Sequence, residues 1–330
     1  MTTRRTLLKA AAIVALMLAA PVSGIPDGPL RAVATFSILG DMVSRIGGEH
    51  VTVTTLVGPG GDAHVYRPTP AAARAVSEAQ MLVVNGLDFE GWLDRLIQAS
   101  DFAGIRVVAT AGIEPMAVED DEDEHGHDDD HGEGRSAEAH DDGHDGHDHG
   151  AFDPHAWQSL PHAVVYVDNI TSALAKADPD NAGTFYRNRA AYVAEIEALD
   201  AEIRGMFADL PAGSRTIVTS HDSFRYFGRD YGLTFIAPQG LSTASEASAR
   251  DVARLIQFIR DQGIRAVFPE NVADPRLLER IADETGAAIG GTLYPGALSG
   301  PDGPVPTYLD MMRHNARTLA QALSSRGDAR

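Results

Sequence analysis

The chain has 330 residues, no cysteine and a formal net charge of −20 at pH 7. Without cysteine we expect no disulfide bond, no thiolate metal ligand and no lipid attached to an N-terminal cysteine. The length is sufficient for two domains of ordinary size. No cluster of basic residues stands out that would bind phosphate groups, so we expect no nucleic-acid partner.

Residues 1–24 have the pattern of an export signal. Basic residues, among them the pair Arg4-Arg5, precede an apolar stretch at 10–20, and small residues at 22–24 offer a cleavage site. The apolar stretch is shorter than the about 20 residues that a transmembrane helix needs. We therefore expect a cleaved signal, used by the Sec or the twin-arginine route, and a mature protein in the periplasm without a lipid anchor.

Short β-rich runs alternate with helical patterns through the first part of the chain. Strands are expected at 32–36, 51–57, 81–85 and 106–110. Apolar residues at helical spacing lie between them, at 41–46, 71–79 and 90–99. This alternation is typical of a parallel sheet that is covered by helices on both faces.

A very polar tract fills residues 117–150. It contains fifteen acidic residues, seven histidines and one basic residue, Arg135, and so accounts for −14 of the formal charge. Such a composition predicts a disordered loop. Imidazole and carboxylate groups bind divalent transition metals. We therefore expect an accessory metal-binding loop, whose histidines are His125, His127, His131, His140, His144, His147 and His149.

The second part of the chain begins with one long helical pattern and then repeats the earlier alternation. Apolar and aromatic residues recur at three- and four-residue steps over 180–210. A helix of this length, about 40 Å, can connect two domains as a rigid linker. Further strands are expected at 215–220, 234–237, 266–269 and 287–293, and helices at 249–262, 275–285 and 308–323.

These elements predict an α/β fold with two domains, each a mostly parallel sheet flanked by helices, with a metal site in the cleft between them. The expected boundaries are a signal peptide at 1–24, an N-terminal domain at 25–178, a linker helix at 179–210 and a C-terminal domain at 211–330.

Three of the six histidines outside the polar tract stand at comparable places in the predicted sheets. His64 follows the second expected strand through a glycine-rich turn, and His221 comes directly after the strand at 215–220. His155 lies in the segment that returns from the fourth strand and the tract. Ligands of open α/β sheets bind outside the carboxyl ends of the strands. The three imidazoles should therefore meet in the cleft and form a metal site.

The segments around these histidines carry a family resemblance. They read GDAHVYRPTP at 61–70, DPHAW at 153–157 and SHDSFRYF at 220–227. In this order they resemble the three ligand motifs of the zinc-binding periplasmic proteins that serve ABC importers, the ZnuA-like, cluster A-I solute-binding proteins. The resemblance extends over nearly all of the mature chain, including the long linker helix and the acidic, histidine-rich loop.

The resemblance implies that His64, His155 and His221 bind the metal. Family members selective for manganese tend to carry a carboxylate at the position of His221, so an imidazole there favours zinc, which prefers nitrogen to an all-oxygen set of ligands.

One position departs from the family pattern. The usual fourth ligand is an aspartate in the loop after the last strand, and Gly296 occupies that position here. Water, a residue of the polar tract or Asp302 would have to take its place. Glu270, at the end of the strand 266–269, is expected to orient one of the histidines.

The leading hypothesis is that the chain captures Zn²⁺ in the periplasm and delivers it to the permease of an ABC importer in the inner membrane. Zinc is then the transported ligand. We expect a monomer, with a periplasmic zinc chaperone as a further partner. Two alternatives are a zinc buffer or chaperone without a transporter, and a zinc enzyme that uses the open fourth position. Because no H-E-x-x-H or other hydrolase motif is visible, we expect no enzyme.

Overall fold

The computed structural model describes residues 28–118, 151–211 and 214–324. The export signal expected at 1–24 lies outside these residues. Within the described ranges, no helix combines the length and the apolar character that crossing a bilayer requires.

The first domain is built on a parallel four-stranded sheet in the order β2-β1-β3-β4. Its strands are β1 (Leu30–Phe36), β2 (Val51–Val57), β3 (Met81–Val84) and β4 (Ile105–Val108). Its helices include α1 (Ser37–Gly47), α2 (Pro70–Ser77) and α3 (Leu93–Ser100). Every residue of the central strand β3 is buried, as expected for a parallel strand with both faces covered.

The second domain repeats this plan with the order β6-β5-β7-β8, and its strand pairs are again parallel. Its strands are β5 (Thr216–Thr219), β6 (Thr234–Ile236), β7 (Ala266–Phe268) and β8 (Ala288–Ile289). Its helices include α6 (Arg225–Tyr231), α7 (Ala249–Gln262) and α8 (Arg276–Thr285).

The strand expected at 287–293 is much shorter in the structure. Only β8 pairs with β7, and Leu293 then forms an isolated bridge with Glu270. Gly290 and Gly291 interrupt the run between them. Glycine has no side chain to pack on a sheet, which explains the early end of the strand.

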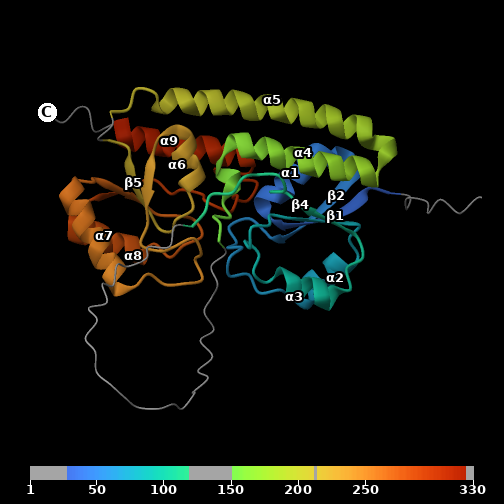
Figure 1. Ribbon diagram of the computed structural model, residues 1–330, viewed down its shortest axis with the longest axis horizontal. Coiled ribbons are helices and arrows are strands. Elements are labelled where there is room, and N and C mark those ends of the chain that lie inside the picture. Colours follow the sequence, from blue (N-terminus) through green and yellow to red (C-terminus); the bar gives the residue numbers. More distant parts are fainter. Residues whose placement is uncertain (1–27, 119–150, 212–213, 325–330) are drawn as a thin grey trace, which may run out of the picture.

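Long helices extend along both domains (Figure 1). Helix α5 (Ala182–Phe207) contacts α1 and α4 (Leu160–Ala177) of the first domain and α6 of the second. The C-terminal helix α9 (Tyr308–Ser324) packs against α5 and also against α1, although it belongs to the second part of the sequence. The remaining short 3₁₀ helices are η1 (Gly48–His50), η2 (Ala156–Gln158) and η3 (Pro179–Asn181).

The predicted fold class is confirmed, since two parallel-sheet α/β domains and a long helix are present. The exact domain boundaries remain a prediction. Two helices were missed in the sequence, α4 and α6. Helix α4 begins with a clear signal, because the Ser159 side chain caps the amide of His162 and a proline follows in the first turn.

Candidate metal centre

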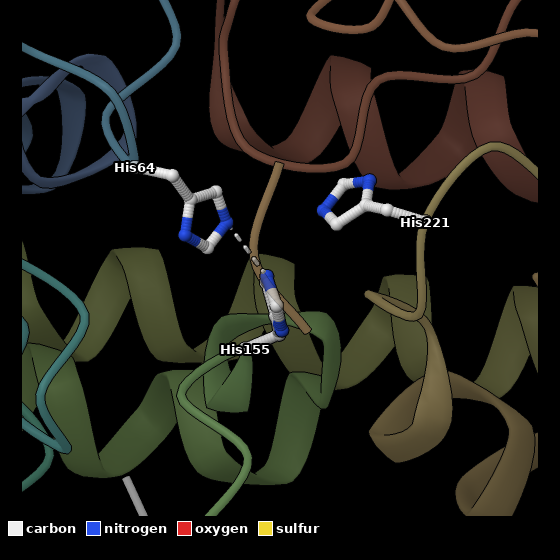
Figure 2. Close-up of side chains that lie close together, drawn as sticks. All are labelled: His64, His155 and His221. Atoms are coloured by element: carbon white, nitrogen blue, oxygen red, sulfur yellow. Dashed lines mark hydrogen bonds between the residues drawn. The ribbon is translucent and has the colours of Figure 1, made fainter. Parts of the chain in front are cut away.

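Three histidines meet at the carboxyl ends of the strands, as the sequence predicts. His64 lies in the loop after β2, His221 follows β5, and His155 directly precedes η2 (Figure 2). One nitrogen of each imidazole lies within 4.8 Å of the others. The Nε2 atoms of His64 and His155 are 3.2 Å apart. His155 and His221 are each only 1% exposed, whereas His64 is partly exposed.

The three imidazoles border a very small chamber. Its volume is about 10 Å³, close to the space that one water molecule occupies. Within the described part of the chain, no other histidine, aspartate or glutamate joins the three in a group of this size. Three converging nitrogen donors are suited to a divalent transition metal such as zinc.

Two buried carboxylates orient two of the rings. Glu270 is hydrogen-bonded to Nδ1 of His221, and Asp153 Oδ1 lies 2.8 Å from Nδ1 of His155. A carboxylate that accepts the Nδ1 proton leaves Nε2 of the same ring free to bind a metal. Glu270 was singled out in the sequence analysis. The role of Asp153 was missed, although it stands two residues before a histidine, as Asp62 does.

The surroundings act differently on the pKa of each histidine. Burial lowers the pKa of His64, and the neighbouring histidines lower it further. Burial also lowers the pKa of His155, although its hydrogen bond to the Asp153 carboxylate opposes this. For His221, burial again disfavours the charged ring, but the negative charge and hydrogen bond of Glu270 outweigh it and raise the pKa. The lowered pKa values of His64 and His155 favour the neutral imidazole, which is the form that binds a metal.

The loop that carries Gly296 also reaches the chamber. The side chains of Trp157 and Gln158 both donate hydrogen bonds to the Pro295 carbonyl, at 2.7 and 2.6 Å. Gly296 lines the chamber, and a Cβ atom built on it would lie 3.6 Å from the Trp157 ring, an ordinary contact. A side chain would thus be tolerated at this position, but glycine supplies no ligand.

Among the described residues, the other expected metal ligand, Asp302, is not part of this group. Asp302 is exposed in a turn in which Gly303 donates to the Gly300 carbonyl, and it does not join the three histidines. The structure therefore gives no support to Asp302 as the fourth ligand. The seven histidines of the polar tract lie outside the described residues.

The first two residues of the polar tract pair with the two residues that follow it. Ala117 forms an antiparallel bridge with Phe152, and the Val118 amide donates to the Ala151 carbonyl at 3.0 Å. The prediction of disorder over 117–150 is therefore wrong for its first two residues, because pairing with Ala151 and Phe152 holds their backbone. The paired residues Ala151 and Phe152 directly precede Asp153, whose amide donates to the Met116 carbonyl at 2.8 Å.

A buried carboxylate, Glu90, supports the segment that carries His155. It accepts hydrogen bonds from the Thr35 hydroxyl at 2.6 Å and from the amides of Asn85 and Gly86 at 2.7 and 3.2 Å. Asn85 in turn donates to the Pro154 carbonyl at 2.9 Å. Burial raises the pKa of Glu90, which these three donors oppose.

Replacing Glu90 with alanine should destabilise the metal-free protein by about 3 kcal/mol, because three donors, two of them in buried hydrogen bonds, lose their acceptor. The measurement is urea unfolding of the purified protein. Glu114, which is exposed, gives a matched Glu→Ala control and should change the free energy of unfolding by less than about 0.5 kcal/mol. Equal stability of the two variants would contradict the role given to Glu90.

Two parallel-sheet domains connected by a long helix, with three histidines that converge at the strand ends, indicate the class of the substrate-binding proteins of metal ABC transporters. The family model described as "Zinc-uptake complex component A periplasmic" matches residues 32–322. The chain therefore belongs to this ZnuA family.

Individual relatives are named for different metals. The manganese-binding lipoprotein MntA of Bacillus subtilis is 33% identical over 303 residues, which cover 90% of each chain. The iron-binding protein YfeA of Yersinia pestis is 32% identical over 291 residues, 88% of this chain and 85% of YfeA. The structure of the periplasmic zinc-binding protein TroA of Treponema pallidum matches with a TM-score of 0.78 and 28% identity, over 90% of this chain and 99% of TroA.

These similarities establish a metal-binding component of an ABC importer and leave the metal open. The relatives are solute-binding proteins and not enzymes, so the alternative of a zinc enzyme is set aside. MntA is named a lipoprotein, whereas this sequence contains no cysteine that would carry a lipid. A mature protein free in the periplasm therefore remains a prediction.

Proposed function

We propose that the chain captures Zn²⁺ in the periplasm and delivers it to the permease of an ABC importer. The observation that carries this proposal is that, among the described residues, the group that could hold a metal consists of three imidazoles and no carboxylate. Nitrogen donors favour zinc, whereas manganese prefers oxygen donors and stands lowest in the affinity order of the divalent first-row transition metals. The fourth ligand is then water or a residue of the polar tract.

The position of the chamber relates metal binding to the arrangement of the domains. His64 and His155 belong to the first domain, and His221 belongs to the second. A metal bound by all three histidines stabilises the arrangement of the two domains in which the three rings meet, relative to arrangements in which they are apart. The permease would recognise the loaded protein by this difference. We further propose that the chain acts as a monomer, that a periplasmic zinc chaperone supplies it, and that the polar tract collects zinc weakly.

The test is equilibrium dialysis of the mature chain and of a variant without residues 119–149, with zinc and manganese in competition. Because Val118 and Ala151 are already paired, a single asparagine in place of residues 119–149 forms a two-residue Asn-Gly turn with Gly150. We expect both proteins to hold one tightly bound zinc, favoured over manganese by about a hundredfold or more. The full chain should hold additional, weakly bound zinc.

Two outcomes would change the proposal. Manganese bound as tightly as zinc would make the zinc assignment wrong. A fall in the tightest zinc affinity on deletion of residues 119–149 would show that the tract supplies the fourth ligand and does more than collect metal.

A further inference from the structure

The loops that carry His64 and His155 share a turn but differ in what holds it. In each loop, an aspartate two residues before the histidine accepts a hydrogen bond from the histidine amide, at 2.9 Å in both cases. Asp153 also binds the ring of its own histidine. Asp62 instead uses its other oxygen, Oδ2, to accept a hydrogen bond from the Thr243 hydroxyl at 2.5 Å. Thr243 belongs to the second domain, so this hydrogen bond joins the two domains.

His64 is the least anchored of the three histidines. Carboxylates bind the rings of His155 and His221, whereas among the described residues no carboxylate binds the ring of His64. Its ring contacts Phe89, with 4.8 Å between the ring centroids, and it remains partly exposed. The position of this imidazole therefore depends on the backbone of its loop.

That backbone is held from the other side of the cleft at two points. The Gly60 amide donates to the Leu298 carbonyl at 2.8 Å, and Asp62 is bound by Thr243. Only the second contact is made by side chains, and it acts two residues from His64. The Asp62 carboxylate thus connects the His64 amide directly to the second domain.

The same carboxylate lies between the chamber and a larger cavity. A cavity of about 520 Å³ is lined by residues of the second domain, including Ser220, Gln239 and Thr243. Asp62 and Val272 line both this cavity and the small metal chamber. A metal that leaves past the partly exposed His64 would therefore pass Asp62 and enter the larger cavity.

We propose that Asp62 and Thr243 are positioning residues for metal retention: their hydrogen bond across the cleft holds His64 against the metal, and breaking it is the first step of release. His155 and His221 keep the metal during this step because their rings are held by carboxylates. The inference rests on the proposed function, since it assumes that the three histidines bind the metal.

The experiment uses the full mature chain and measures the rate at which zinc is lost to an excess of a chromogenic chelator in a stopped-flow instrument. Thr243→Val keeps the shape of the side chain and removes its hydroxyl. We expect zinc release about tenfold faster, since a hydrogen bond to a charged group is lost. Thr243→Ser keeps the hydroxyl, so this variant should release zinc as slowly as the native chain. Ser245→Ala is the matched control, because its hydroxyl lies in the same segment and makes no hydrogen bond with the described residues.

Two further readouts separate positioning from a general loss of structure. The Tm of the metal-free protein should differ little between Thr243→Val and the native chain. In a His64→Ala background, Thr243→Val should have no further effect on release, because the hydrogen bond acts through His64. An unchanged release rate in Thr243→Val, or an equal acceleration in the His64→Ala background, would overturn the inference. Failure of the native chain to bind zinc tightly would instead overturn the proposed function.

Discussion

Replacing His221 with alanine should lower the zinc affinity of the metal chamber by about a hundredfold or more. Zinc sites in proteins release roughly 12 kcal/mol on binding, so one of four ligands contributes about 3 kcal/mol, and each 1.4 kcal/mol corresponds to a factor of about ten. His221 is also the second domain's contribution to the group. Its loss should therefore weaken metal binding and also uncouple it from the arrangement of the domains.

The measurement is equilibrium dialysis against a zinc buffer, on the chain without residues 119–149 so that weak sites do not interfere. His314→Ala is the matched control: its half-buried side chain binds the Thr292 carbonyl at 3.0 Å, outside the chamber, and zinc affinity should not change. The replacement leaves Glu270 buried without its histidine, so the Tm of the metal-free variant must be measured as well. Native zinc affinity in a folded His221→Ala protein would contradict the proposed site.

Replacing Glu270 with glutamine should lower zinc affinity at neutral pH by about ten- to a hundredfold, the usual effect of removing a charged partner of a ligand histidine. The glutamine carbonyl can still accept the Nδ1 proton of His221, so the ring should keep its orientation. What changes is the charge. A neutral amide makes the imidazole a weaker donor for the metal and no longer raises its pKa.

The pH dependence of zinc binding distinguishes this effect from a structural one. A protonated imidazole cannot bind the metal, so protons compete with zinc below the pKa of each histidine. Glu270 raises the pKa of His221 above 6.5, whereas those of His64 and His155 are lowered. As the pH is lowered, the zinc affinity of the native chain should therefore begin to fall while the pH is still above 6.5. The fall should be about a factor of ten per pH unit for one proton.

In Glu270→Gln the onset of this loss should move to lower pH, so the two affinities should converge as the pH falls. Glu279→Gln serves as the control, because Glu279 lies exposed on α8. Identical pH profiles for the native chain and Glu270→Gln would show that Glu270 does not control the protonation of His221.

Local features of the sequence were sufficient for most of the secondary structure. Helix α7 was predicted with its exact bounds, because Ser248 caps its first turn and Gly263 ends it with a positive φ of 60°. Strand β2 was predicted with its exact bounds as well. Helix α4 was missed despite its capping serine.

The sequence by itself determined the α/β class, the order of the strands along the chain and the three histidines at comparable strand ends. These features follow from hydrophobic periodicity and turn residues, which act over a few neighbouring positions. The composition of the polar tract is likewise a local property.

The sequence pointed to Glu270 as a partner of one histidine, but which groups contact each ring follows from the tertiary structure. The contacts of Glu270 with His221 and of Thr243 with Asp62 join segments 49 and 181 residues apart. Such contacts depend on the register of the sheets and on how the two domains pack, and no local pattern encodes either. The same holds for the chamber itself, where loop packing against Trp157 brings Gly296 beside the metal ligands and leaves one position without a protein ligand among the described residues.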